Sequence, residues 1–257
     1  MSSIENFQLH LSSNYADKIF NNNNADAEFY LPTIEIPSQY HLHINVVHAS
    51  IPFTFYNVNS SNNVLNYTLI IPFPGTNISY SLVIPQGNYT VNTMKTYLNT
   101  NLLNFTVSYD STTNKFKFVQ KDNLDFTLES TSSCLRLLGF TGQTTSTSYN
   151  LTSTQTVNLN PIRCICVCTN LRTSNININS KNKSNIICSI PITTQPNSII
   201  TYLNPNNFKI NTYANVLSSL KIQLMDQDGN ILNLNGANWS MTIQFDVIDF
   251  VDDNPIH

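Results

Sequence analysis

The segment Trp239-Ser-Met-Thr-Ile-Gln-Phe-Asp-Val247 alternates large apolar residues with polar ones. Successive side chains of a β-strand point to opposite faces, so the apolar residues share one face and the polar residues the other. This pattern predicts a strand with one face against a core and the other in solvent. The same rhythm occurs upstream in Leu220-Lys-Ile-Gln-Leu-Met225, and Gly229 in the intervening Asp226-Gln-Asp-Gly-Asn230 can adopt the positive φ that a turn requires.

Alternation of period two predicts strands over most of the remaining chain. The clearest are Glu28–Ile36, Tyr40–Phe55, Asn63–Ile71, Ser79–Ile84, Arg163–Thr169, Ile186–Ile190, Leu217–Met225 and Trp239–Phe250. Many strands with few helices are typical of a sandwich of two sheets, and we expect a mainly β fold, a jelly roll or a related β-sandwich.

One stretch departs from the β rhythm. Thr90 is a plausible N-cap for a helix over Val91–Leu103, whose apolar residues at helical spacing are Met94, Tyr97, Leu98 and Leu102. A hairpin of Phe105–Tyr109 and Phe116–Val119 follows, and a short second helix is expected near Ser132–Leu138, ended by Gly139. We therefore expect a small α+β insertion at residues 77–150 within a jelly-roll domain of residues 1–76 and 151–257.

The composition narrows the classes of function. Only 11% of the 257 residues are charged, and the formal net charge is −3. A nucleic-acid-binding protein usually carries a basic stripe, and none is found, so we expect no direct contact with nucleic acid. No apolar run is long enough to span a bilayer, and the N-terminus does not resemble a signal peptide.

Candidate metal or catalytic residues are sparse, and we expect no cofactor, no metal ion and no enzymatic activity. Cys164, Cys166 and Cys168 alternate along one predicted strand, so their sulfurs lie on one side but too far apart for one tetrahedral ion; we interpret them as reduced core residues. His41 and His43 also share one strand face and lack an obvious third ligand. The Asp226–Asn230 segment is interpreted as a turn rather than a calcium loop, because the later Glu of such a loop is absent. Four acidic residues are interpreted as part of a solvated C-terminal end: Asp246, Asp249, Asp252 and Asp253.

The N-terminal segment offers a candidate contact with a neighbouring subunit. The apolar residues Phe7, Leu9 and Leu11 precede the polar run Asn21–Asn24, which we interpret as a flexible connection. This arrangement suggests a mobile arm that reaches another subunit.

Several short phrases of sequence occur in a defined order along the chain. They are Ile84-Pro-Gln-Gly-Asn-Tyr-Thr90, Leu98-Asn99, Leu137-Leu-Gly-Phe140, Val157-Asn-Leu159, Thr169-Asn-Leu171 and the ending Ile222-Gln-Leu-Met-Asp-Gln-Asp-Gly-Asn-Ile-Leu-Asn-Leu-Asn-Gly-Ala-Asn-Trp-Ser240. Together they resemble penton and minor capsid proteins of virophages, polinton-like viruses and large DNA viruses of protists. The order of the phrases and the Asp-x-Asp-Gly … Gly-x-x-Trp-Ser ending carry most of the resemblance.

The resemblance implies a structural capsid protein with a single jelly roll that forms a homopentamer at the icosahedral fivefold vertices. Its implied partners are its own copies, the major capsid protein and also minor capsid proteins. Its implied location is the virion, assembled in the host cytoplasm. The alternative interpretation is a receptor- or carbohydrate-binding β-sandwich, such as a fibre head or lectin-like module, because surface Tyr and Asn suit sugars.

Overall fold

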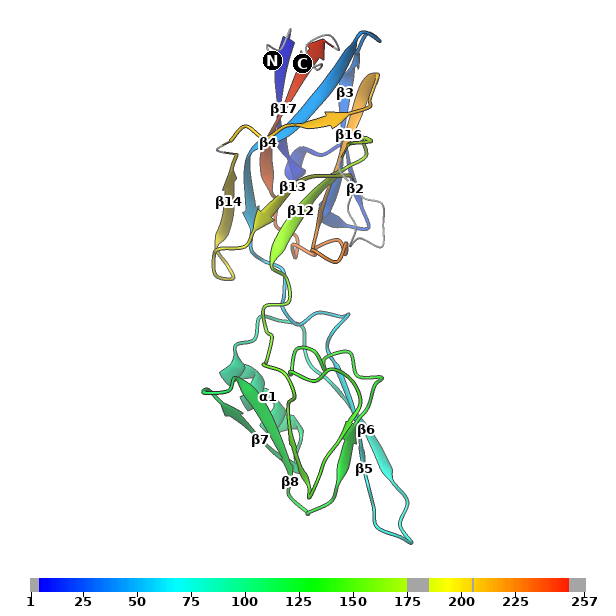
Figure 1. Cartoon of the computed structure of the whole chain (residues 1–257), viewed down its shortest axis with the longest axis vertical. Helices are drawn as coiled ribbons and strands as arrows, with labels where there is room; N and C mark the ends of the chain where they lie inside the picture. Colours follow the sequence, from blue (N-terminus) through cyan, green and yellow to red (C-terminus); the bar gives the residue numbers. More distant parts are fainter. Residues whose placement is uncertain (1–4, 175–184, 205, 250–257) are drawn as a thin grey trace, which may run out of the picture. The chain divides into compact units, whose positions relative to one another are not determined.

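The structure, a computed structural model, describes residues 5–174, 185–204 and 206–249. The chain divides into two compact units (Figure 1). Unit 1 combines the chain up to Phe55 with the chain from Ile162 onward, and unit 2 is the single stretch Tyr56–Pro161. No helix in these described ranges is both long and apolar enough to cross a lipid bilayer.

Unit 1 contains two antiparallel sheets. In the first, the order is β1 (Glu5–Ser12), β17 (Ser240–Asp249), β4 (Tyr40–Pro52) and β14 (Ile199–Leu203), and β15 (Ile210–Thr212) also pairs with β4. In the second, the order is β13 (Asn185–Pro191), β12 (Cys164–Thr169), β16 (Val216–Met225), β3 (Asn23–Glu35) and β2 (Lys18–Phe20). The short 3-10 helix η1 (Ser13–Tyr15) connects β1 to β2.

The pairing within unit 1 is nested. The long strands follow one another along the chain as β1, β3, β4, β12, β13, β14, β16 and β17. The first pairs with the last, β3 with β16, β4 with β14 and β12 with β13, as in one long hairpin. Rolling such a hairpin into two sheets also places β17 beside β4 and β16 beside β12. This is the jelly-roll arrangement of antiparallel strands. Unit 2 is inserted between β4 and β12.

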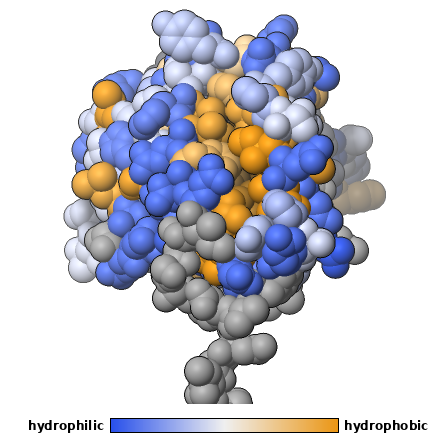
Figure 2. Space-filling view, turned by 90° about the horizontal axis from the view of Figure 1, so that it is seen from above, coloured by the Kyte–Doolittle hydropathy of each residue, from blue (hydrophilic) through white to orange (hydrophobic). Residues whose placement is uncertain are grey.

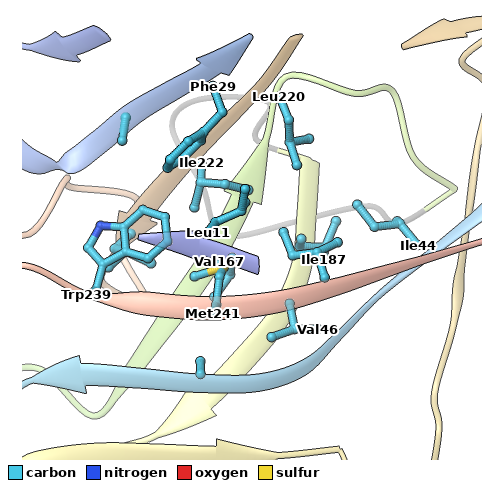
Figure 3. Close-up of a cluster of buried hydrophobic side chains, with 14 of the residues drawn as sticks. Leu11, Phe29, Ile44, Val46, Val167, Ile187, Leu220, Ile222, Trp239 and Met241 are labelled. Atoms are coloured by element: carbon cyan, nitrogen blue, oxygen red, sulfur yellow. The ribbon is translucent and has the colours of Figure 1, made fainter. Parts of the chain in front are cut away.

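The core of unit 1 lies between its two sheets (Figure 3). The residues that the alternation predicts for the inner face of this last strand are buried: Met241, Ile243, Phe245 and Val247 in β17, and Trp239 directly before it. The Trp239 ring packs edge-on against Phe29, with ring centroids 6.0 Å apart, and its indole N–H donates a hydrogen bond to the Asn24 carbonyl oxygen at 2.6 Å. The indole therefore fills the core without leaving its polar atom unsatisfied.

The run Asn21–Asn24 is not the flexible connection expected from its composition. Asn21 and Asn22 adopt positive φ angles of 54° and 53° and form the turn between β2 and β3. The Asn23 side chain donates to the Leu232 carbonyl oxygen at 2.7 Å, and Asn24 donates to the Gly236 carbonyl oxygen at 3.1 Å. Asn tolerates the left-handed region better than most residues, which explains its use in this tight turn.

Unit 2 has its own core and two small antiparallel sheets. The first has the order β10 (Thr144–Thr145), β9 (Phe126–Leu128), β5 (Val64–Leu69) and β6 (Ile78–Val83). The second has the order β11 (Asn150–Thr152), β8 (Lys115–Gln120) and β7 (Phe105–Asp110). The helix α1 (Val91–Asn101) buries Met94 and Leu98 against this core.

The predicted helix and hairpin of unit 2 are confirmed, whereas the second helix is not. Thr90 caps α1 through a capping box with Thr93. Residues 132–138 form turns instead of a regular helix. The stretch nevertheless ends as predicted: Gly139 has a φ of 85°, and the Phe140 N–H donates to the Leu135 carbonyl oxygen at 2.8 Å.

The insertion is larger than the expected range 77–150. Unit 2 spans Tyr56–Pro161, so β5 belongs to it and not to the jelly roll. The reason is strand pairing: β5 forms hydrogen bonds with β6 and β9, both within unit 2. Nothing in the local sequence of β5 indicates which sheet the strand joins.

Candidate assembly surface

One edge of the unit 1 sandwich carries exposed apolar side chains. There, β13 ends one sheet, and β14 and β15 flank β4 in the other. Ile199 and Leu203 on β14 and Phe208 in the following loop are 56%, 68% and 66% exposed. We call this region, made of Ile186, Ser189, Ile199, Tyr202, Leu203 and Phe208, the lateral surface.

A groove of about 440 Å³ lies within the lateral surface, where the two sheets part. No Asp, Glu, Lys, Arg or His is among its described lining residues, which include Ile186, Tyr202 and Phe208. Burial raises the pKa of the Cys188 thiol and of the Tyr202 hydroxyl, so both groups are neutral at physiological pH. A partner can enter this groove without the cost of stripping water from a charge.

The loop that carries Phe208 is fastened to the first sheet by neutral hydrogen bonds. The Asn204 side chain donates to the Phe208 carbonyl oxygen at 3.0 Å and accepts from the Phe208 N–H at 3.1 Å. The Asn204 N–H also donates to the Val47 carbonyl oxygen at 3.0 Å, and the Asn45 amide donates to Asn207 at 3.0 Å. These contacts hold the Phe208 backbone in place while its ring projects into solvent.

An ion pair adds a further anchor under the same loop. The Lys209 ammonium lies 3.0 Å from the Asp246 carboxylate, whose side chain is only 1% exposed. The Gln244 amide donates to the other Asp246 oxygen at 2.9 Å. Asp246 points away from the core on β17, so the sequence pattern predicted that it lies in solvent. This prediction is wrong because the loop covers Asp246. Asp252 and Asp253, which were predicted in the same way, lie outside the described residues. A buried carboxylate with these partners fixes the position of the loop.

The lateral surface has the properties of a protein interface. Edge strands expose unpaired N–H and C=O groups, and proteins usually protect them with charges or proline. β14 has the sequence Ile-Ile-Thr-Tyr-Leu and carries neither. A Phe side chain has only two rotatable bonds and therefore loses little entropy on binding, which makes Phe208 a suitable anchor residue.

The structure places Phe7, Leu9 and Leu11 in β1, which pairs along its whole length with β17 of the same chain. Leu11 is buried in the core, and the Phe7 ring stacks on Phe245 with centroids 5.1 Å apart. Within the described residues, this segment is thus a strand of its own jelly roll and not an arm that leaves it. β1 is also the edge strand of its sheet, so the side of its backbone that faces away from β17 pairs with no other strand of the described chain.

The three alternating cysteines share one face of β12, as predicted, but not the face that was expected. Ile165 and Val167 point into the core between the sheets. Cys166 and Cys168 are buried on the opposite face, beside Met225. Burial raises the pKa of the Cys166 thiol to about 12, and none of the five cysteines, all of which lie in the described ranges, forms a disulfide bond. Cys164, Cys166 and Cys168 therefore act as small apolar residues on the outer side of the second sheet.

The remaining candidates form no ion site among the described residues. The His41 and His43 rings lie 5.0 Å apart, and the described chain contains no group of three His, Cys, Asp or Glu that could hold a metal ion. The Asp226 carboxylate accepts from the backbone N–H groups of Asp228 and Asn230, both at 2.9 Å. With Gly229 at a φ of 82°, this segment is the predicted turn.

A second apolar area lies at the end of unit 1 where β17 finishes. Figure 2 looks onto this end and shows hydrophobic residues gathered in its middle, with hydrophilic residues on either side. Tyr213 and Val216, near the same end of the sandwich, are among the exposed large hydrophobic residues of the chain.

The sequence predicted the strand Ile186–Ile190, which lies within β13, but missed β14 and the Phe208 loop, which supply the rest of the lateral surface. β14 was not among the predicted strands, because its five residues are flanked by prolines and asparagines that resemble a loop. A usable signal was present: the stretch Ile199–Phe208 contains several large apolar residues and no charge. In a chain so poor in charge, that signal does not stand out.

Together, the nested strand pairing and the insertion between β4 and β12 define a single jelly roll with an inserted α+β unit. No protein-family model matches the chain, and no curated protein matches its sequence. Among solved structures, the chain is similar to the selenomethionine-labelled mavirus penton protein, with a TM-score of 0.52 and 11% sequence identity. The match covers 95% of this chain and 100% of that one, so it includes both units. The expected fold and the resemblance to penton proteins are thereby confirmed at the level of the fold.

Proposed function

We propose that this chain is a structural capsid subunit of the penton type, which forms homopentamers at the fivefold vertices of an icosahedral particle. The observation that carries the proposal is the match to a penton protein over nearly the whole length of both chains. A fold alone does not define a function, so the proposal also needs a surface suited to assembly. The lateral surface of unit 1 supplies one.

The position of the lateral surface suits a ring. A closed ring requires two different patches on each subunit, placed so that the repeated rotation closes. The lateral surface lies along the β13 and β14 edges, and the opposite edges of the same two sheets are β1 and β2. Between β1 and β2, η1 exposes Tyr15 to 81%. We assign this second edge as the patch that meets the lateral surface of the next copy.

The proposed partners are other copies of the chain, the major capsid protein and minor capsid proteins. The proposed location is the virion, after assembly in the host cytoplasm. The apolar area in Figure 2 is the candidate contact for a capsid neighbour outside the ring, since it lies at the end of the sandwich and not along its edges. The backbone of β1, which contains Phe7, Leu9 and Leu11, would contribute its free edge to the second patch of the ring.

Mass measurement of the purified chain tests the proposal. Five copies of the 29.0 kDa chain give a ring of about 145 kDa, which native mass spectrometry and sedimentation velocity distinguish from other oligomers. We expect that species at micromolar concentrations, and cryo-electron microscopy of particles should place it at the vertices. A chain that stays monomeric at high concentration, or that is absent from the vertices, would exclude the proposal.

A further inference from the structure

A groove in unit 2 has a composition that the assembly role does not use. It has a volume of about 480 Å³ and runs along the exposed side of α1. The side chains that matter are those of Tyr89, Asn92, Thr96, Tyr97 and Asn101. Asn92 and Thr96 are exposed on the side of the helix away from the buried Met94 and Leu98, whereas the Tyr89 and Tyr97 rings pack against the edge of the unit 2 core and are only partly buried.

Two tyrosine rings form the apolar part of this groove. The Tyr89 hydroxyl donates to the Pro85 carbonyl oxygen and the Tyr97 hydroxyl to the Val83 carbonyl oxygen, both at 3.0 Å. The rings contact each other edge to face, with centroids 6.1 Å apart. Because both hydroxyl groups are tied to the backbone, the rings are fixed and offer their carbon surfaces to a ligand.

Neutral hydrogen-bonding groups stand beside these rings. Asn92 and Thr96 are one helical turn apart, so they project from the same side of α1. Within the described chain, neither the Asn92 amide nor the Thr96 hydroxyl makes a hydrogen bond. The Asn101 amide donates to the Tyr97 carbonyl oxygen at 2.8 Å, which leaves its side-chain oxygen free to accept. The groove lining thus offers hydrogen-bond donors and acceptors as well as the two tyrosine rings.

The groove also has no charged lining. None of its described lining residues is Asp, Glu, Lys, Arg or His, and burial raises the pKa of both tyrosines, which keeps them neutral. A phosphate or an acidic peptide would find no counter-charge there. A purely apolar ligand would strip water from the Asn and Thr side chains without replacing their hydrogen bonds.

We propose that this groove binds a neutral oligosaccharide. A sugar ring has an apolar C–H face that packs on an aromatic ring and a rim of hydroxyl groups that pair with amides and hydroxyls. The α1 groove offers both kinds of contact side by side, within the size range of small-ligand sites. The inference concerns unit 2 by itself and does not depend on the oligomeric state.

The test uses the full-length protein on an array of neutral, sialylated and sulfated oligosaccharides, followed by titration calorimetry with the strongest neutral ligand. Thr96→Lys should abolish binding by filling the groove, and Asn92→Ala should weaken it about fivefold to tenfold through loss of a hydrogen bond. The matched control is Thr106→Lys, since Thr106 is an exposed threonine on β7 of the same unit and does not line the groove.

Binding of neutral glycans that survives Thr106→Lys but not Thr96→Lys supports the proposal. Three results would overturn it: no binding to any neutral glycan, binding restricted to charged glycans, or equal binding by the wild type and Thr96→Lys. The array measures ligand binding, and the mass measurement detects the pentamer. Failure of the glycan-binding proposal is therefore distinguishable from failure of the proposed capsid function.

Discussion

Replacing Phe208 by serine should weaken assembly far more than it weakens folding. The ring is 66% exposed in the single chain, so little packing is lost within the subunit. Full burial of a Phe side chain is worth about 1.5–3 kcal/mol, so covering the exposed two thirds contributes roughly 1–2 kcal/mol at each subunit contact. The loop should keep its shape, because the Asn204 side chain bonds the Phe208 backbone and not its ring.

A closed ring multiplies this effect. A pentamer has five such contacts, so the substitution removes roughly 5–10 kcal/mol from the free energy of assembly. Five chains associate in four steps, and each 1.4 kcal/mol per step changes the required concentration tenfold. We therefore expect the concentration for half-assembly to rise by roughly tenfold to seventyfold. Sedimentation velocity over a dilution series measures it.

The matched control is Phe73→Ser, because Phe73 is 98% exposed in unit 2, between β5 and β6, and outside the lateral surface. It should assemble as the wild type does. At a concentration low enough for all three proteins to be monomeric, both variants should melt at the wild-type temperature. If Phe208→Ser assembled within twofold of the wild-type concentration, or if Phe73→Ser impaired assembly equally, our assignment of the lateral surface would be refuted.

Three further substitutions test the packing arguments. Lys209→Met leaves the buried Asp246 carboxylate without its cation and should lower the free energy of unfolding of unit 1 by about 3 kcal/mol in urea titrations. The double variant Lys209→Met/Asp246→Asn should recover part of this loss. An unchanged urea midpoint in Lys209→Met would mean that the ion pair does not hold the loop. Thr90→Ala removes the capping box of α1 and should cost unit 2 about 1 kcal/mol, whereas Thr106→Ala should cost little; equal losses would contradict the cap. Burial raises the pKa of Cys134 from 9.0 to about 12, so the folded state resists ionisation of this thiol and stability falls as the pH rises above 9. At pH 10 ionisation of Cys134 in the unfolded chain lowers the free energy of unfolding by roughly 1.4 kcal/mol. The free energy of unfolding of Cys134→Ala should therefore decline less steeply between pH 8 and pH 10. If it declined in parallel with that of the wild type, the result would argue against a buried, neutral thiol.

The elements that could be predicted are those whose pattern is local. The inner face of β17 and the Thr90 cap of α1 depend on residues close together in sequence, and both are as expected. Pairing between distant segments left no such mark, so β5 was assigned to the wrong unit. The burial of Asp246 depends on a loop that is remote in sequence, and the exposure of Phe208 depends on anchors from β4. The lateral surface therefore became visible only in three dimensions.

The nested pairing of unit 1 also sets the order in which a growing chain can fold. β17 lies between β1 and β4 in one sheet, and β16 lies between β12 and β3 in the other. The two strands synthesised last are thus the ones that join the early strands of each sheet. Unit 2 is one continuous stretch with its own core, so it can fold during translation. The jelly roll must wait, because a ribosome that stops before Ser240 produces β1 and β4 without the strand that connects them.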